Sequence, residues 1–373
     1  MKLLRLLMLP FAALVVILAR LGLPIRFGEI FSSRIGHMAG NMECYFNEKA
    51  AGLSKGWDWW YHRCEPCNAQ LGRMLDRKLR VRPAAFIRLC ATLNCMFKGW
   101  EKQQIDTVHI DRDIYNLIGK YPPHFQFTKA EERMGEAGLV AMGIQTKAKW
   151  VCLIVRDAAY LPHFAYHSFR DSAPDSYAQA ALMLANRGYY VLRMGAKVEK
   201  PFNADHERVV DYATKHRSDF MDIYLAAKCE FALSNGNGLD AVCTSFHRPV
   251  CFVNFTPLEY LATWLSRSLA IWKHHVKDGK RMTPAEIWAS GAGLFMRAEQ
   301  YAEAGITLVD NTPEEITEAA LEMADNLKPE IGPNPFMQEF WRTFPNSASE
   351  YTGKPLHGKF RMRIGAEFLR GYL

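Results

Sequence analysis

The chain has no long, uninterrupted hydrophobic run. In its 373 residues the longest early uncharged stretch extends from Leu6 to Ala19, short of the roughly 20 apolar residues that a helix needs to cross a bilayer. It also has no block of consecutive lysines and arginines, which argues against a basic arm for nucleic acid. No repeat or low-complexity tract is visible. What remains is a chain with 49% hydrophobic and 23% charged residues, typical of a globular protein long enough for two domains.

Cysteine is present nine times but without the spacing of a disulfide framework. Cys64 and Cys67 form one C-x-x-C pair, and Cys90 and Cys95 have the wrong spacing to complete a zinc site. A chain of this size does not need disulfides for stability, so we expect reduced thiols in the cytoplasm. We therefore predict buried thiols and no metal at these cysteines, and we predict no cofactor for the chain.

Positive charge is in modest excess. The formal net charge is +7, from 46 Lys and Arg against 39 Asp and Glu. Such an excess favours an anionic partner. Since no nucleic-acid arm is present, we expect an acidic substrate or a phospholipid surface.

The segment 1–22 is the exception to this globular composition. Lys2 and Arg5 precede its apolar run, Arg20 and Arg26 follow it, and no A-x-A cleavage site is present. This pattern predicts a segment that lies in the headgroup region of a membrane. A signal anchor with a short span and a buried first helix are the alternatives. The predicted location is the cytoplasm, in association with the inner membrane.

The fold is clearest after Lys149, where strands and helices alternate. "WVCLIV", "YYVLRMG", "CEFALS" and "PVCFVNF" are apolar runs separated by helical patterns, which predicts an α/β fold with a parallel, Rossmann-like sheet covered by helices on both faces. "GITLVDN" predicts one more strand. We place a first lobe at 23–147, a second at 148–345, and at 346–373 a C-terminal helix that could return to the first lobe.

Ligands of such sheets bind beyond the carboxyl ends of the strands. The segment "CEFALSNGNGLDAV" (229–242) there reads as strand, glycine turn and helix, whose exposed amides favour an anion. It lacks the third glycine of a dinucleotide motif, and a plain turn is the alternative. The predicted ligand-binding residues of this segment are Ser234, Asn235, Gly236, Asn237, Gly238 and Asp240.

Two further strand ends carry suitable residues. Arg156 and Arg170 lie in the long connection after "WVCLIV", and Arg193 and Gly195 follow the next strand. Arginines offer bidentate donors to a diphosphate. Asp175, later in the long connection, is a candidate general base.

Two candidates come before the sheet. His37, flanked by Gly36 and Gly40, is a second candidate base; a helix-capping turn is the alternative. Asp111-Arg112-Asp113 has the D-x-D form of many metal–nucleotide sites, but three-residue patterns are common by chance. Here it also precedes the strand–helix series that it would be expected to follow.

In order along the chain, "SRIGHMAGN", "CLIVRD", "HSFRDS", "RSDFMDIYLAAK", "SNGNGLDAV", "RPVCFVNFTPL" and "RIGAEFL" resemble a family of bacterial glycosyltransferases associated with surface polysaccharide. The resemblance extends from about residue 30 to the end. It implies a metal-independent enzyme with two facing Rossmann-like lobes (GT-B), the first on the acceptor side and the second binding a nucleotide sugar. The acceptor would be a surface-polysaccharide glycan or a lipid-linked glycan.

The same resemblance implies roles for the candidate residues. Arg156, Arg170 and the glycine-turn amides would hold the donor diphosphate, and Arg193 and Gly195 would lie near its base or ribose. Asp240 would meet sugar hydroxyls, and His37 or Asp175 would be the base. The alternatives are a pyruvyl or phosphoglycerol transferase, or a non-catalytic sugar-binding or assembly protein at a membrane surface.

Overall fold

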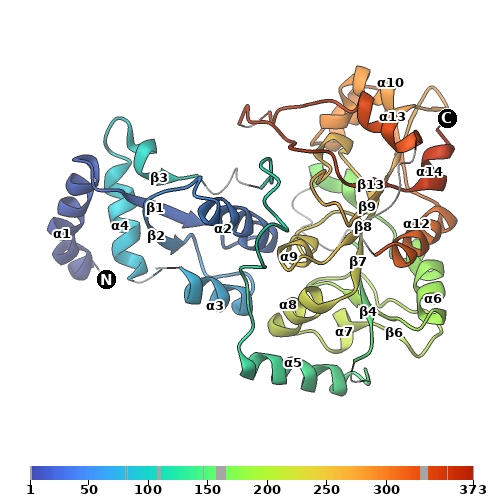
Figure 1. Ribbon diagram of the computed structural model, residues 1–373, viewed down its shortest axis with the longest axis horizontal. Coiled ribbons are helices and arrows are strands. Elements are labelled where there is room, and N and C mark those ends of the chain that lie inside the picture. The colour runs from blue at the N-terminus through green and yellow to red at the C-terminus, as the bar shows by residue number, and fades with distance from the viewer. Residues whose placement is uncertain are drawn as a thin grey trace. The chain divides into compact units, whose positions relative to one another are not determined.

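The computed structural model describes residues 2–79, 81, 83–106, 111–145, 147–156, 165–327, 335–350 and 352–372. The chain forms two compact units. The first comprises Met1–Asp113 and Leu117–Thr128, and the second comprises Ile114–Asn116 and Lys129–Leu373. Each has its own sheet (Figure 1).

The first unit is built on a three-stranded parallel sheet in the order β2-β1-β3. Its strands are β1 (Ile25–Ile30), β2 (Trp57–His62) and β3 (Gln104–Ile105). The chain leaves the central strand β1 into a π-helical turn, η1 (His37–Asn41), which continues directly into α2 (Met42–Ala50). The other helices are α1 (Lys2–Arg20), α3 (Ala69–Lys78), α4 (Ala84–Asn94) and the short η2 (Trp100–Gln103).

Helix α1 packs on this unit through small side chains. Ala12, Val16 and Ala19 are buried in one cluster with residues of β1, β2 and α4. Within the described ranges, no helix has the length and apolar character needed to cross a membrane.

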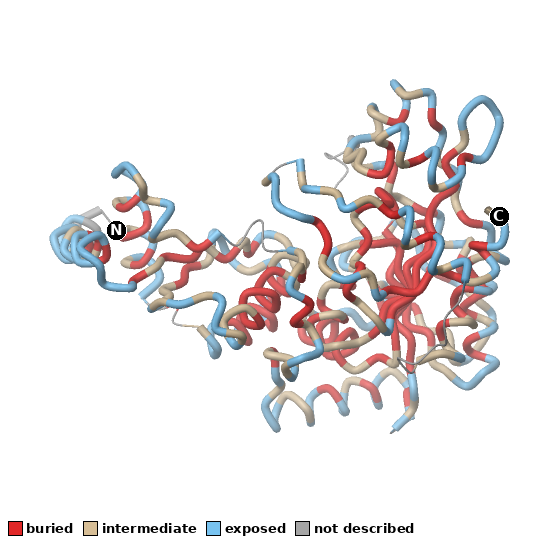
Figure 2. The backbone as a smooth tube through the Cα atoms, turned by 45° about the horizontal axis from the view of Figure 1, so that its top comes forward, coloured by how far each residue is buried: buried red, intermediate tan, exposed pale blue. Residues whose placement is uncertain are grey.

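The second unit contains a seven-stranded parallel sheet in the order β13-β9-β8-β7-β4-β5-β6. This confirms the predicted α/β class with a parallel sheet, and all four of the apolar runs named above form strands. The strands are β4 (Trp150–Ile154), β5 (Tyr190–Met194), β6 (Val209–Val210), β7 (Phe231–Ser234), β8 (Val250–Phe255), β9 (Leu269–Trp272) and β13 (Arg363–Ile364). Figure 2 shows buried backbone concentrated on the centre of this sheet.

Helices connect and cover these strands. They are α5 (Lys129–Ala141), η3 (Ala165–Arg170), η4 (Pro174–Tyr177), α6 (Ala178–Asn186), α7 (Tyr212–Lys215), α8 (Asp219–Lys228), α9 (Asp240–Ser245), η5 (Leu258–Tyr260), α10 (Pro284–Ser290), η6 (Ala292–Leu294), α11 (Ala298–Glu303), α12 (Pro313–Asp325), α13 (Pro335–Thr343) and α14 (Ala366–Arg370). The predicted strand "GITLV" forms as β12 (Ile306–Val309). It lies in a small antiparallel sheet with β10 (His274–Lys277) and β11 (Lys280–Arg281), outside the parallel sheet.

The division into units differs from the predicted boundary at 147–148. Helix α5 belongs to the second unit because it packs closely on α8: a Cβ at Gly135 would lie 2.1 Å from the Tyr224 ring, and Lys228 pairs with Glu132 at 2.8 Å. The segment 346–373 also belongs to the second unit, where β13 pairs with β9.

The strand order places a topological switch point between β4 and β7. From the central β4 the chain continues outward to β5 and β6, and then returns to add β7, β8 and β9 on the other side. The crevice at the carboxyl ends of such a strand pair is where sheets of this kind bind ligands. The glycine turn follows β7, so it lies at this position.

Candidate functional site

Asn235 joins the loops that follow β4 and β7. Its side-chain oxygen accepts a hydrogen bond from the Arg156 amide at 2.9 Å. Its side-chain nitrogen donates to the carbonyls of Arg156 at 3.3 Å and Arg170 at 3.0 Å. Because Asn235 is 1% exposed, these bonds form in a buried setting, where hydrogen bonds fix geometry strongly. The structure therefore brings the predicted arginine loop and glycine turn together.

The two arginines have different surroundings. Arg170 is half-buried and donates through Nη2 to the Gly236 carbonyl, so its guanidinium lies on the glycine turn. Arg156 is 9% exposed, and its Nε pairs with Asp171 at 2.7 Å. Residues 157–164 of this connection lie outside the described residues.

The sequence predicts that the amides of the glycine turn bind an anion, but in the structure several of them donate to side chains of the turn. Gly236 N donates to Ser234 Oγ at 3.1 Å, Asn237 N to Asp240 Oδ2 at 2.6 Å, and Leu239 N to Asn237 Oδ1 at 3.0 Å. Helix α9 has six residues, so its dipole is small. The turn is thus organised by its own side chains, and these three amides already have acceptors.

Asp240 occupies the position that we expected a ligand to take. Its carboxylate accepts from Asn237 N and from Ser234 Oγ at 2.8 Å, and the residue is 8% exposed. Burial raises the pKa of Asp240 to about 6, against the lowering effect of these hydrogen bonds and of Arg170. The prediction that Asp240 meets sugar hydroxyls is not supported by this inward orientation.

Two of the predicted donor residues are structural here. Arg193 is 1% exposed and donates to the Met194 carbonyl, so a ligand cannot reach its guanidinium in this arrangement. A Cβ at Gly195 would lie 2.7 Å from Val198, which explains a glycine at the end of β5. The Arg193 side chain thus supports the end of β5, and the glycine at 195 leaves room for Val198.

Sequence reasoning missed a buried polar network beside the turn. Lys273, directly after β9, is 4% exposed and contacts Asp310 at 2.8 Å and the Asp171 carbonyl at 2.6 Å. Asp310 in turn accepts from Ser172 at 2.9 Å, and Ser172 accepts from Asn254 at 2.9 Å. The network links the Arg156–Asp171 pair to the ends of β8 and β9. Recognition of "LAIW" as a strand could have pointed to Lys273.

In the first unit, His37 also follows the carboxyl end of a parallel strand. It lies in η1, after β1. Burial lowers its pKa, with Arg34 and Arg63 adding to the effect and Asp111 opposing it. Its Nδ1 is buried and has no hydrogen-bond partner among the described residues. π-Helical turns are often found at functional sites. A neutral imidazole in this setting suits a general base.

The other candidates are separate from these clusters. Asp175 is 71% exposed and pairs with Lys200 at 2.6 Å. In the D-x-D segment, Asp113 accepts from the Leu117 and Ile118 amides at 2.8 and 2.7 Å, so its carboxylate is committed to the backbone. In the part of the chain that the structure describes, no group of three or more His, Cys, Asp or Glu side chains could hold a metal.

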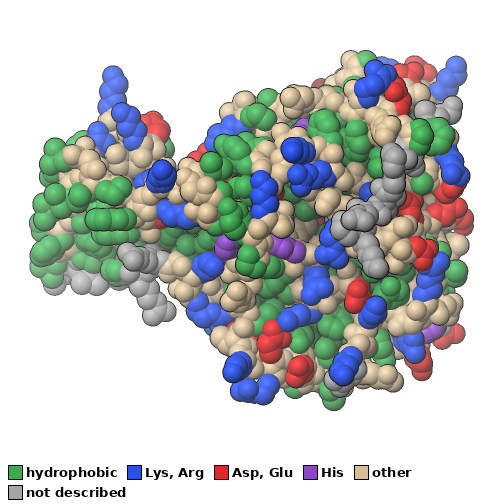
Figure 3. Space-filling model, in the orientation of Figure 1, with side chains coloured by type: hydrophobic (Ala, Val, Ile, Leu, Met, Phe, Trp, Pro, Cys, Tyr) green, Lys and Arg blue, Asp and Glu red, His purple; other side chains and the backbone are tan. Residues whose placement is uncertain are grey.

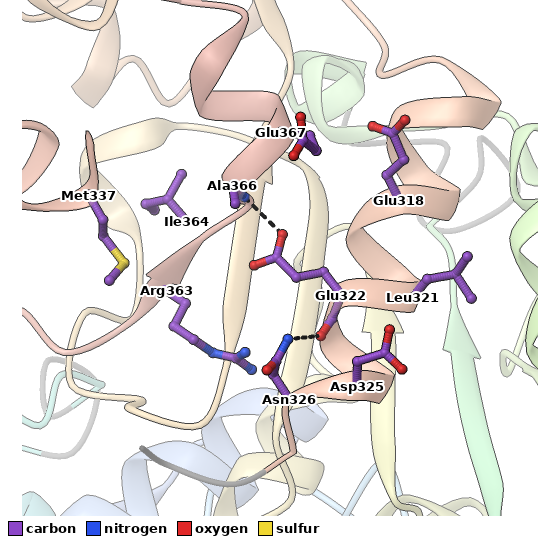
Figure 4. Close-up of a pocket in the computed structure, with 10 residues that line it drawn as sticks. All are labelled: Glu318, Leu321, Glu322, Asp325, Asn326, Met337, Arg363, Ile364, Ala366 and Glu367. Atoms are coloured by element: carbon purple, nitrogen blue, oxygen red, sulfur yellow. Dashed lines mark hydrogen bonds between the residues drawn. The ribbon is translucent and has the colours of Figure 1, made fainter. Parts of the chain in front are cut away.

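A pocket of about 500 Å³ lies at the β13 edge of the sheet, between α12, α13 and α14 (Figure 4). Glu322 on its wall accepts from the Ala366 amide at 2.8 Å. Strands β9 and β8 lie between β13 and the switch point at β7 and β4. The pocket is therefore distinct from the candidate site.

No family model matches the chain, and no curated protein matches its sequence. Among solved structures, it is similar to a glycosyl transferase family 9 protein from Veillonella parvula, with 9% identity and a TM-score of 0.44 over 80% of this chain and 97% of that one. It is also similar to E. coli ADP-heptose LPS heptosyltransferase II (13%, 0.39, 80% and 100%). A third similar structure is E. coli heptosyltransferase WaaC with ADP (12%, 0.33, 75% and 99%).

Proposed function

We propose that the chain is a glycosyltransferase that binds a nucleotide-sugar donor at the carboxyl ends of β4 and β7. The observation that carries the proposal is the position of Arg170, whose guanidinium lies on the glycine turn at the switch point of the sheet. A nucleoside diphosphate leaving group needs positive charge where its own charge develops. Arg170 supplies it, and Arg156 lies one hydrogen-bonded residue away through Asn235.

We also propose that the transfer does not depend on a metal ion. The D-x-D carboxylate Asp113 is occupied by two backbone amides, and arginines can take the electrostatic role of a divalent ion. We propose His37 as the base that accepts the proton of the acceptor hydroxyl, since burial keeps its imidazole neutral near pH 7. The acceptor proposed is a glycan or lipid-linked glycan of surface polysaccharide.

The test is a thermal-shift panel of free nucleotides and nucleotide sugars, with and without EDTA. A ligand at a hundred times its Kd stabilises by about 2.7 kcal/mol, which corresponds to roughly 5–10 °C for a unit of this size. We expect at least one nucleotide sugar to give such a shift, and EDTA to leave it unchanged. If no nucleotide or nucleotide sugar shifts the melting temperature, the proposed function is wrong.

The donor affinity of Arg170→Ala tests whether the donor binds at the ends of β4 and β7. Loss of one charged partner of a phosphate costs roughly 1.5–3 kcal/mol, or about ten- to a hundredfold in donor affinity. The matched control is Arg187→Ala, which removes an arginine from a surface pair with Asp325 in the same unit. Equal donor affinity in the two variants would place the donor elsewhere.

A further inference from the structure

Helix α1 has two apolar faces, and only one of them is covered. Ala12, Val16 and Ala19 are buried, at most 3% exposed, in the cluster that includes Ile87, Cys90 and Ala91 of α4. Their spacing of four and three residues defines a single stripe. This stripe is the attachment of α1 to its unit.

The second stripe has the same spacing on the other side. It consists of Leu7, Phe11, Leu14, Leu18 and Leu21, which are between 37% and 80% exposed. At 100° per residue the two stripes are centred roughly 150° apart. Leu6 and Ile17, 71% and 51% exposed, widen the outer stripe. We call these seven residues the outer face of α1.

The outer face continues beyond the helix. Arg20 donates to the Lys98 carbonyl at 2.7 Å and lies over the Phe97 ring at 5.1 Å. The loop after α4 therefore lies beside the end of α1. Met96 and Phe97 in that loop are 76% and 47% exposed. Figure 3 shows hydrophobic side chains gathered over the α1 end of the first unit.

Exposed hydrophobic surface of this extent is unusual for a chain that remains alone in water. A helix that is apolar all round belongs in a protein interior or in lipid. Because one stripe of α1 is already used against α4, the helix lies flat on its unit. The outer face therefore points away from the unit along the whole side of the helix, as in helices that lie in the plane of a membrane interface.

Charge decides which partner fits. The segment 1–22 contains Lys2, Arg5 and Arg20 and no acidic residue, whereas Arg26 after it pairs with Asp58 at 2.7 Å. Exposed Arg20 and Lys98 lie at the edge of the outer face. An apolar stripe bordered by cations complements an anionic phospholipid surface, where each basic residue near the headgroups adds to binding. A second copy of the chain would bring these cations against one another.

We propose that the outer face of α1, together with Met96 and Phe97, docks the first unit on an anionic phospholipid bilayer. The helix lies parallel to the surface and does not cross it. This docking is independent of the donor site, and it is measured without any nucleotide sugar.

The experiment is co-flotation of the full chain with vesicles of phosphatidylcholine, alone or mixed with phosphatidylglycerol. We expect binding to the mixed vesicles, weakened by salt, because exposed charges are screened. The double variant Phe11→Glu/Leu14→Glu should lower the partition coefficient by more than tenfold, since each large apolar side chain contributes at least that factor. The melting temperature should stay unchanged because both side chains face solvent.

The matched control is Val140→Glu on α5, which places the same charge at an apolar position that is 65% exposed in the second unit. It should bind vesicles like the parent chain. Arg20→Ala/Lys98→Ala should reduce the preference for phosphatidylglycerol. No binding of the parent chain to either vesicle would overturn the proposal, as would full binding of the Phe11/Leu14 variant. A dimer in light scattering that this variant dissociates, without vesicle binding, would assign the face to a second copy.

Discussion

Burial favours the neutral form of two predicted site residues, Asp240 in the second unit and His37 in the first. It raises the pKa of the Asp240 carboxyl to about 6 and lowers the pKa of the His37 imidazole. The consequences differ because the groups differ. The Asp240 carboxyl accepts two hydrogen bonds within the glycine turn, whereas a neutral His37 can accept a proton.

Asp240 makes the second unit less stable as the pH rises from about 4 to 6. In that window the folded state holds a proton that the unfolded chain, with a pKa near 3.9, has already released. The stabilisation is therefore complete below the unfolded pKa and lost as the pH passes the folded pKa. Urea unfolding at pH 4.5 and 7 should show a decrease of about 2 kcal/mol, because about 1.5 of the roughly 2.1 pH units between the two pKa values lie above pH 4.5.

The comparison variant is Asp240→Asn, which has no titrating group at this position. Its unfolding free energy should fall less than that of the parent chain between the two pH values. An identical fall in parent and variant would mean that Asp240 is ionised throughout, contrary to its burial.

His37→Ala should lower the turnover of a nucleotide sugar by about a hundredfold or more, because general-base assistance is worth that much. Donor affinity should not change, since His37 belongs to the first unit and the proposed donor residues to the second. Steady-state assays that give kcat, and binding titrations that give the donor Kd, separate an effect on turnover from an effect on donor affinity. Loss of donor affinity with kcat retained would give His37 a binding role.

Sequence reasoning located residues better than it assigned their roles. The rule that ligands bind beyond strand ends found Arg156, Arg170 and the glycine turn, which the structure brings together. It could not show that Arg193 and Asp240 are buried, because burial depends on side chains distant in sequence. Lys273 was missed for the same reason: its partner Asp310 is far along the chain.

At the scale of elements, the two glycines of the glycine turn have different backbone conformations. Gly236 has φ +80°, and a Cβ there would lie 3.1 Å from the Phe255 ring. Gly238 is not among the glycines with positive φ. Only Gly236 therefore needs to be glycine for the backbone to fold.

Alanine at each glycine should separate folding from binding. Gly236→Ala should destabilise the second unit by about 1 kcal/mol or more, since an L-residue is strained at that φ. Gly238→Ala should leave the melting temperature unchanged and weaken the donor if the diphosphate approaches the backbone there. Melting curves and donor titrations of both variants are the measurement. Donor binding by Gly238→Ala equal to that of the parent would make the turn purely structural.

Elements with continuous apolar runs were the easiest to predict. β4, β5, β7 and β8 are buried along most of their length, so their sequences carry the signal on their own. β6 and β13 have two residues each, too few for any periodicity, and they exist because neighbouring strands offer partners. The predicted boundary put α5 in the first lobe, whereas the structure puts it in the second unit. The helix packs on α8 through Gly135 and Gly138, which give no signal in the sequence.

At the scale of the whole molecule, each unit has its own sheet and its own buried core. Chains built in this way need not unfold in one step. We expect two calorimetric transitions, of which a bound nucleotide sugar raises only the one that belongs to the second unit. A single transition, or an equal shift of both, would contradict this expectation.

Substitutions of two glycines in α5 would show which calorimetric transition belongs to the second unit. Gly135→Ala places a methyl group 2.1 Å from the Tyr224 ring and should lower it, because overpacking costs about 1–3 kcal/mol. Gly138→Ala meets the flexible Met221 side chain, at 2.5 Å from Sδ, which can move aside. The second variant gains helix propensity and should be close to neutral.

The pairing of β13 with β9 has a consequence for the chain while it is being made. β9 is fully buried in the finished sheet, and its outer edge is satisfied by bonds such as Gly365 N to the Ala270 carbonyl at 3.1 Å. On the ribosome, however, "LAIW" emerges well before Arg363, with α10 to α13 in between. During that interval the nascent sheet presents an apolar strand with free amides and carbonyls, the kind of edge to which other chains add. Until β13 has emerged and paired with β9, the growing chain therefore presents an edge strand to which other chains can add.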